Sequence, residues 1–425
     1  MTHHKLFLEE RPSIGLSFFR LFAAFTVGAH IIPTLLPLQD NYLSTAFKEK
    51  NPSFFTPLAL GIVEASPDGL VIFMTVFFLV FLFFFAIGLF SQISCILMVL
   101  GCYYFYALNS LHIGTLSYDI LLVTLFLMCI TGYHGDFFSV DSLRRGDPLA
   151  YKKKRPFFVQ RLLQIQIAST FFYTGLCKFT ASGNWLTANP IYYLLNSVPE
   201  SAVKHFPGRV FFAHQPQLCY FIGIFIILSE LSMPFLLFYR RTRYWAIAYG
   251  FLFHIMLVAT LHVPTIFFFL FPPQLLLFIN PEDIVAWIDK KRGQNAAKGR
   301  EKIIYDGHCH FCVGSIRRVQ VLDLTAKLEP VNYQPIEDLS KIDARLTRDL
   351  CHSQMQLLTK NGKLYGGFYA FRRMTLILPL LFPLAPVMYF PGMQWIGSFI
   401  YNLIAKNRYL LHRKGTCKDN LCFRP

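Results

Sequence analysis

The amino-acid sequence predicts a polytopic α-helical membrane protein with about eight spans, followed by a small C-terminal α/β domain. The first observation behind this prediction is the composition: 54% of the residues are hydrophobic and only 15% are charged, whereas soluble domains carry about 25% charged residues. The second is that phenylalanine gathers in runs such as residues 81–85, which lipid solvates far better than water does. The third is a Cys-x-x-Cys motif at Cys309 and Cys312, beyond the apolar part of the chain.

The strongly basic balance, a formal net charge of +16, agrees with a membrane protein. The lysines and arginines lie in short segments between apolar stretches, which is typical of cytoplasmic loops. We therefore expect membrane lipid as a partner and no nucleic acid. Residues 2–12 are charged and polar, and the apolar stretch that follows lacks a small-residue cleavage pattern, so no cleavable signal peptide is expected.

Eight apolar stretches are candidate spans, because a spanning helix needs about 20 predominantly apolar residues. They cover residues 14–38, 69–91, 93–109, 116–132, 159–178, 218–239, 244–262 and 263–280. The last two stretches meet near Pro264, so they are either two separate spans or two halves of one broken helix pair.

Three basic segments predict how these spans are oriented. They are residues 144–155, residues 240–243 and residues 290–292. Two spans separate each segment from the next, so all three fall on one side of the membrane, which the positive-inside rule makes the cytoplasm. The N-terminus and the dithiol domain are then cytoplasmic as well, and the localisation that fits best is a bacterial inner membrane.

The composition changes near residue 290 and predicts three parts: a membrane domain over 1–289, a polar linker over 290–301 and a dithiol domain over 302–425. In the last part we expect strands at 302–305 and 327–333, a helix beginning at Cys309, and a hairpin over 354–365. Asn361-Gly362 supports the hairpin, because this dipeptide is the strongest short turn signal. A further helix is expected from Phe368. This order of strands and helices is typical of a thioredoxin-like fold.

A second apolar region, residues 375–404, contains four prolines at 379, 383, 386 and 391. Proline interrupts the backbone hydrogen bonds of a helix. We therefore expect membrane-associated helices that seat the dithiol domain on the membrane, with a ninth span as the alternative.

The run from Tyr305 to Cys312, Tyr-Asp-Gly-His-Cys-His-Phe-Cys, carries thiol chemistry. Cys309 at a helix N-terminus gains a stabilised thiolate, and Cys312 one turn later is placed to resolve a mixed disulfide. A cationic His310 would stabilise the thiolate further. The alternative is a zinc site completed by a second cysteine pair, Cys417 and Cys422, although that spacing is longer than in zinc ribbons.

The same run resembles the DCC family of thiol–disulfide oxidoreductases, named for its Asp-Cys-Cys pattern. Residues 366–371 and 405–409 are also similar to that family, and the resemblance covers about 302–417. It implies a thioredoxin-like fold with redox activity. Asp306, Cys309 and Cys312 are the residues that carry over.

Residues 172–179, Phe-Tyr-Thr-Gly-Leu-Cys-Lys-Phe, with the following Gly183-Asn184-Trp185, resemble the HTTM (horizontally transferred transmembrane) family. That family includes vitamin K-dependent gamma-carboxylase, and the resemblance covers about 10–280. It implies that Lys178 matches a lysine proposed as the base toward a reduced quinone. A partly desolvated lysine can act in this way, so a quinone is the candidate cofactor. The alternative is that Lys178 snorkels to the interface beside Trp185.

The sequence departs from the carboxylase at two points. A histidine is expected shortly before the position matched by Tyr118, but Gly114 aligns there and the nearest histidine is His112. The large lumenal domain that binds the peptide substrate also has no counterpart. We therefore do not expect glutamate carboxylation.

Besides Lys178, the ionisable residues Arg20, Asp119, Glu230, His254 and His262 fall inside or beside candidate spans, where such groups are functional candidates. His254 and His262 are eight residues apart on one expected helix, and Glu230 lies on another. They are candidates for cofactor binding or a proton relay. Packing against buried partners is the alternative, and no metal is assigned.

Together these features predict a membrane-bound thiol–disulfide oxidoreductase that acts on a thiol or disulfide protein or small molecule, coupled to a quinone or another lipophilic substrate. The alternative is a membrane component of peptide maturation, transport or carboxylase-like modification, with an accessory redox domain. One difficulty is that the dithiol is expected inside and Lys178 outside. Cysteines 95, 102, 129 and 177 are candidate relays, but nothing in the sequence brings them together.

Overall fold

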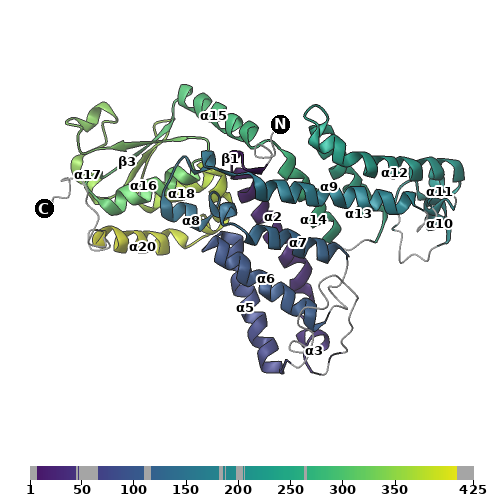
Figure 1. Ribbon diagram of the computed structural model, residues 1–425. Helices are drawn as coiled ribbons and strands as arrows, with labels where there is room; N and C mark the ends of the chain where they lie inside the picture. The colour runs from purple at the N-terminus through teal and green to yellow at the C-terminus, as the bar shows by residue number, and fades with distance from the viewer. Residues whose placement is uncertain are drawn as a thin grey trace. The chain divides into compact units, whose positions relative to one another are not determined.

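The structure is a computed structural model that describes residues 7–44, 46, 66–109, 116–180, 185–186, 188–197, 204, 206–262 and 266–408. The chain divides into two compact units. The helical unit consists of residues 1–141 and 153–282, and the sheet unit of residues 142–152 and 283–425. Figure 1 follows the chain through both.

Every candidate span of the sequence corresponds to a helix of the helical unit. These helices are α2 (Ile14–Leu35), α5 (Asp68–Ile87), α6 (Ser91–Leu108), α7 (Leu116–Cys129), α9 (Phe158–Phe179), α12 (Pro216–Phe238), α13 (Arg243–Thr260) and α14 (Ile266–Leu275). Shorter helices of this unit are α3 (Leu38–Asn41), α10 (Pro190–Ser197) and α11 (Arg209–Ala213), with 3-10 turns η1 (Tyr133–Gly135) and η3 (Leu276–Phe278). The short helix α8 (Val140–Arg145) crosses the boundary between the units, and the 3-10 turn η2 (Ala150–Lys152) belongs to the sheet unit.

Fewer than eight of these helices meet the length and hydropathy expected of a membrane span. Among the described residues, α2, α5, α6 and α12 are long and apolar enough to cross a membrane, and a bent pair in the sheet unit would make five. α7 and α14 are shorter than a bilayer is thick. α9 has the length but carries Gln160, Arg161 and Gln164 in its first turns. The chain is thus an integral membrane protein, while the number eight stays a prediction.

Packing within the helical unit separates core from lipid-facing side chains. α5 lies beside α6, and α9 beside α12 (Figure 1). On α5, Phe78 and Phe85 are fully buried, whereas Phe73 and Phe83 are about 60% exposed. Apolar side chains that point outward in this number fit a lipid surround rather than water. The phenylalanine runs therefore serve both the core and the membrane.

One end of the helical unit collects its basic segments. Strand β1 (Glu10–Pro12) pairs antiparallel with β2 (Lys154–Pro156) just before α9. A polar cavity of about 250 Å³ at this end is lined by Arg11, Arg161, Arg240 and Arg243, among others. The N-terminal segment, the segment before α9 and the turn between α12 and α13 thus share one end, which agrees with an even number of apolar helices between each of them.

The sheet unit contains a four-stranded mixed sheet. Its strands are β3 (Glu301–Tyr305), β4 (Leu328–Asn332), β5 (Gln356–Leu358) and β6 (Leu364–Gly366), in the order β4-β3-β5-β6. β3 runs parallel to β4, and β5 is antiparallel to β3 and β6. The helices are α15 (Pro281–Ala297), α16 (His310–Leu322), α17 (Arg348–Ser353), α18 (Phe368–Ile377), α19 (Ala385–Met388) and α20 (Met393–Asn407), with 3-10 turns η4 (Leu339–Lys341) and η5 (Pro379–Leu384).

Alternation along β3 explains the two cores of this unit, because successive side chains of a strand point to opposite faces. Ile303 packs with α16 and α18 through residues such as Ile316 and Met374. Ile304 packs on the other face with Tyr333 and Cys351. The expected order of strands, helix and hairpin is confirmed, with the hairpin turning at Gly362 (φ +71°).

Two segments of the sheet unit correspond to the predicted linker and to the proline-rich apolar region. α15 continues as a helix through residues 290–297, where the sequence predicts a linker. This segment has no proline, and the helix ends before Gly299, whose φ is +76°. The proline-rich region is broken, as expected: α18 and the η5–α19 segment meet at a bend of 120°. Its exposed apolar side chains, which we call the apolar face, are Phe382, Phe390, Trp395, Phe399 and Leu403.

Candidate functional site

The dithiol lies where β3 leads into α16. After Tyr305 the chain turns through Asp306-Gly307-His308, and the Asp306 carboxylate accepts the backbone N–H of His308 at 3.0 Å. Cys309 is the N-cap residue of α16, in an extended conformation (φ −89°, ψ 108°), and its Sγ accepts the backbone N–H of Cys312 at 3.4 Å. A thiolate here compensates an otherwise unpaired helix N–H group.

The pKa values of the two thiols are shifted in opposite directions. The pKa of Cys309 is lowered from 9.0 to about 7, first by the hydrogen bond from the Cys312 thiol, then by the Cys312 backbone N–H and the positive charge of Arg408. Burial and the negative charge of Asp306 act in the opposite direction. The pKa of Cys312 is raised, mainly because its proton is held by the bond to Cys309. The arrangement favours a thiolate on Cys309 and a protonated Cys312.

A buried ion pair flanks the dithiol. Arg408 Nη2 lies 3.7 Å from Asp306 Oδ2, and both side chains are less than 10% exposed. Gln334 donates to the same carboxylate at 2.8 Å, and Arg408 donates to the backbone carbonyl of His352 at 2.6 Å. Sequence reasoning did not single out Arg408. Arg408 belongs to the 405–409 segment, whose resemblance to the DCC family gave no role for this residue.

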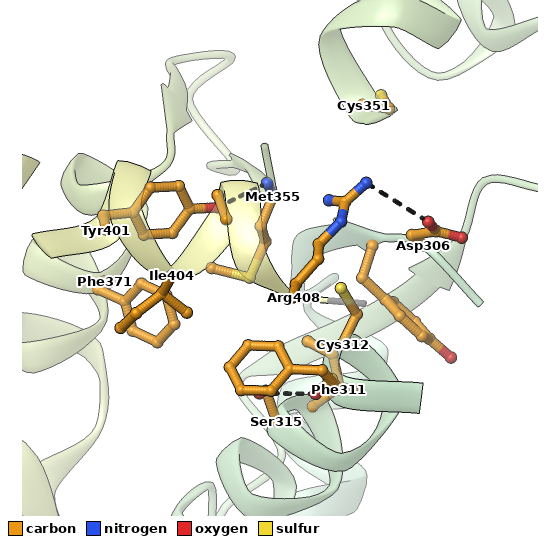
Figure 2. A pocket seen from close by; sticks show the side chains of 13 residues that line it. Asp306, Phe311, Cys312, Ser315, Cys351, Met355, Phe371, Tyr401, Ile404 and Arg408 are labelled. Atoms are coloured by element: carbon orange, nitrogen blue, oxygen red, sulfur yellow. Dashed lines mark hydrogen bonds and ion pairs between the residues drawn. The ribbon is translucent and has the colours of Figure 1, made fainter. Parts of the chain in front are cut away.

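A small cavity of about 60 Å³ opens beside Cys312. Figure 2 shows the Cys312 sulfur close to the Arg408 side chain, whose guanidinium points toward Asp306, with aromatic and aliphatic side chains on the other side. The wall includes Phe311, Met355, Phe371, Tyr401 and Ile404. A cavity of this size holds about two water molecules or a small apolar group.

The other cysteines of this unit and His310 lie at different positions relative to the dithiol. His310, between the two motif cysteines, is the first residue of α16 and is exposed. Cys351 is buried and lines the same cavity, and burial raises the pKa of its thiol. Cys417 and Cys422, the alternative zinc ligands, lie outside the described residues. Within the described part of the chain, no group of three or more His, Cys, Asp or Glu side chains could hold a metal ion.

In the helical unit, the structure brings together two residues that the sequence proposed separately. Lys178 at the end of α9 donates to both carboxylate oxygens of Glu230 on α12, at 2.8 and 2.6 Å. Trp185 lies against the ammonium group, 5.4 Å from Nζ to the ring centre. Gly175 allows this close approach, because a Cβ there would come within 3.0 Å of the Glu230 Cβ. The Glu230 side chain is 7% exposed and the Lys178 side chain 21%.

The two candidate histidines do not join this ion pair. His254 is buried on α13, where its Nδ1 contacts the Gly250 carbonyl at 2.7 Å and its ring packs on Phe171 and Phe271. His262 lies beyond the end of α13 and is exposed. Tyr249, which the sequence analysis did not name, lies near Glu230 and donates to Ser229 at 2.6 Å.

A bundle of apolar helices joined to a sheet unit with a capped dithiol defines a class: integral membrane proteins that carry a thiol-redox unit. Comparison with protein families makes this specific. Residues 10–282 match the family model of the HTTM domain, more than half of the chain, so the chain belongs to the HTTM family. Residues 303–414 match the model of the DCC1-like thiol-disulfide oxidoreductase. Comparisons with curated proteins and with solved structures give no match.

Proposed function

We propose that the protein is a membrane-bound thiol–disulfide oxidoreductase in which Cys309 is the attacking thiolate and Cys312 the resolving thiol. The observation that carries this proposal is the geometry of the N-cap. Cys309 Sγ accepts the Cys312 N–H and has a pKa lowered to about 7, so much of it is ionised near neutral pH. Thiolates are the nucleophiles of disulfide exchange, and a thiol with a pKa near the ambient pH attacks best.

The order of the two steps follows from the lowered pKa of Cys309 and the raised pKa of Cys312. The Cys309 thiolate attacks one sulfur of a substrate disulfide, which forms a mixed disulfide and releases the first substrate thiolate. Cys312 then loses its proton and attacks Cys309 Sγ, which closes the Cys309–Cys312 disulfide and releases the second substrate thiolate. The substrate gains two electrons and the dithiol loses two. The reverse sequence oxidises a substrate dithiol.

Three neighbours have proposed roles in these steps. Asp306 faces the same cavity as Cys312 and is the candidate acceptor for the Cys312 proton. Arg408 stabilises the Cys309 thiolate and holds Asp306 in place. His310, exposed beside the two cysteines, is positioned to meet a partner or, when cationic, to favour the thiolate.

The sheet topology supports a thioredoxin-like fold for this unit. A parallel β3–α16–β4 connection is followed by the antiparallel β5–β6 hairpin and then α18, with the dithiol at the first strand-to-helix junction. The apolar face of Phe382, Phe390, Trp395, Phe399 and Leu403 supports contact between this unit and a membrane surface. We therefore keep residues 302–425 as a dithiol domain whose apolar helices associate with the membrane.

For the helical unit we propose a quinone or another lipophilic substrate, with Lys178 and Glu230 as a proton-sharing pair. An ammonium group has no lone pair, so Lys178 becomes a base only after its proton moves to Glu230, whose Oε2 is 2.6 Å away. This modifies the expectation of an isolated lysine base. We also propose a bacterial inner membrane, with the basic end of the helical unit and the dithiol domain in the cytoplasm.

The test uses the full-length protein in detergent and a fluorescent peptide disulfide as the substrate. The reduced wild-type chain should release about one peptide dithiol per chain while Cys309 and Cys312 become protected from alkylation. Cys309→Ser should abolish this turnover. The matched control is Cys219→Ala, which removes a buried thiol of the helical unit and should leave the turnover unchanged.

Two results would count against the proposal. If Cys309→Ser reduces the peptide as fast as the wild type, another thiol is the nucleophile. If zinc protects Cys309 and Cys312 from alkylation in the protein as isolated, the motif is a metal site. Alkylation from the two sides of sealed membranes tests the orientation separately.

A further inference from the structure

A second pair of thiols meets inside the helical unit. Cys95 on α6 and Cys129 at the end of α7 are 34 residues apart in sequence, yet their Sγ atoms are 3.5 Å apart. Cys95 is fully buried and Cys129 partly buried. A disulfide bond needs about 2.05 Å between the sulfur atoms, so a shift of about 1.5 Å would close it. The eight cysteines of the described residues are all without disulfides in this structure.

The local structure holds these two helix ends together. Asp141 accepts the backbone N–H groups of Phe90 and Ser91 at 3.0 and 2.8 Å, which caps the start of α6. The Gln92 side chain lies 3.4 Å from the Cys129 carbonyl, across the same junction. The position of the two sulfur atoms is thus supported by contacts on both helices. A thiol pair held in this way reacts as a unit rather than as two separate thiols.

The pair lies at the basic end of the helical unit. The segment after Cys129 leads to Asp136, which forms ion pairs of 2.9 Å with both Lys153 and Arg155 beside strand β2. This end also carries the arginine-lined cavity described above. The positive-inside rule assigns it to the cytoplasm, the side that the sequence predicts for the dithiol domain. Lys178, at the opposite end of α9 from Arg161, is therefore remote from this pair.

We propose that Cys95 and Cys129 are a second redox-active dithiol, closed reversibly by a lipophilic two-electron acceptor of the quinone class. This inference rests on the proposed function, because it needs a quinone in the helical unit, and it adds a site of thiol oxidation separate from the Lys178–Glu230 pair. Each turnover removes two electrons and two protons from the two thiols, forms the Cys95–Cys129 bond and converts one quinone to one quinol. A lipid-soluble oxidant suits the site because its thiols lie between apolar helices and Cys95 is closed to water.

The experiment uses the full-length chain with Cys309→Ser and Cys312→Ser, so that the motif dithiol cannot contribute. The reduced protein, in detergent, is mixed with a short-chain benzoquinone, alkylated and digested. We expect a linked peptide pair joining Cys95 to Cys129, about one quinol formed per chain, and loss of alkylation at those two positions. Adding Cys102→Ala, which removes a buried thiol on the same helix, should change none of these three results. Adding Cys95→Ala should leave Cys129 alkylated and form no quinol.

Two outcomes would overturn the inference. Both are measured on a chain that retains Cys95 and Cys129, so they do not depend on whether a variant at either position folds. If the quinone leaves Cys95 and Cys129 alkylated while oxidised glutathione links them, the acceptor is a soluble disulfide. If neither the quinone nor diamide links them, the pair is core packing. Failure here leaves the proposed function standing, because that function is tested by Cys309→Ser in a chain that retains Cys95 and Cys129.

Discussion

The two candidate sites of this protein are built in different ways. The dithiol site is local: Cys309 and Cys312 are three residues apart, and one helix N-terminus positions both. The Lys178–Glu230 site joins residues 52 positions apart on two helices. Both place a charge in a partly buried setting, yet the Cys309 thiolate is stabilised by hydrogen bonds from the Cys312 thiol and its backbone N–H, and the Lys178 ammonium by an opposite charge.

This difference predicts how each site responds to mutation. A helix N-terminus remains when one side chain is changed, so the dithiol site should lose chemistry without losing its fold. A buried ion pair depends on both partners, and removing one leaves the other charge without compensation. The following predictions test that contrast, starting with the largest expected effect.

Replacing the resolving thiol should stop turnover while sparing the first chemical step. In Cys312→Ser, Cys309 still attacks, but the mixed disulfide is not resolved, so the release of peptide dithiol by the reduced protein should fall roughly 100-fold or more. Intact-protein mass spectrometry should find one peptide attached per chain. An unchanged rate would mean that Cys312 is not the resolving thiol. The melting temperature should stay near that of the wild type.

Breaking the membrane ion pair should instead reduce stability. Lys178→Met leaves Glu230 buried without its partner, which should cost about 3 kcal/mol. The melting temperature in detergent should fall by on the order of 3–4 °C for a chain of this size.

The double variant Lys178→Met with Glu230→Leu provides the control for this prediction. It removes both charges and should recover much of the lost stability. Equal losses in the single and double variants would mean that the pair does not act as a unit.

The reactivity of the dithiol should follow pH with a midpoint near 7. The pKa of Cys309 is lowered from its ordinary 9.0, so its thiolate persists down to about pH 7 and is lost below it. Alkylation of the reduced protein should slow about tenfold per pH unit below 7 and level off above it. The stabilising effect of this thiolate on the reduced fold is likewise complete above pH 9 and lost as the pH falls through 7. A midpoint near 9 would contradict the capping argument.

The smallest expected effect concerns Arg408, one of several groups that favour the Cys309 thiolate. Arg408→Gln removes a positive charge beside the dithiol, so the pKa of Cys309 should rise and its alkylation at pH 7 should slow about fivefold. Arg345→Gln, an exposed arginine of the same unit paired with Asp343, is the matched control and should leave the rate unchanged. Equal rates in both variants would show that Arg408 does not contribute to the lowered pKa of Cys309.

Much of the architecture followed from local patterns in the sequence. The helices at the apolar stretches, the strands around the dithiol and the turn at Gly362 are specified by residues close together in the chain. The number of spans did not follow from the sequence. Helix α9 is long enough to span a membrane but contains polar residues, whereas α7 and α14 are apolar but short. The helical conformation of residues 290–297 was also missed, because a polar composition describes a linker and an exposed helix equally well.

By itself, the sequence determined the membrane character of the chain, its resemblance to two families and the dithiol motif, since each depends on composition or on neighbouring residues. The tertiary structure alone decided which distant side chains meet. It paired Lys178 with Glu230 rather than Glu230 with the histidines, brought Arg408 to Asp306, and placed Cys95 against Cys129. The physical reason is that helix packing selects one face of each helix, and no local pattern records which faces will be in contact.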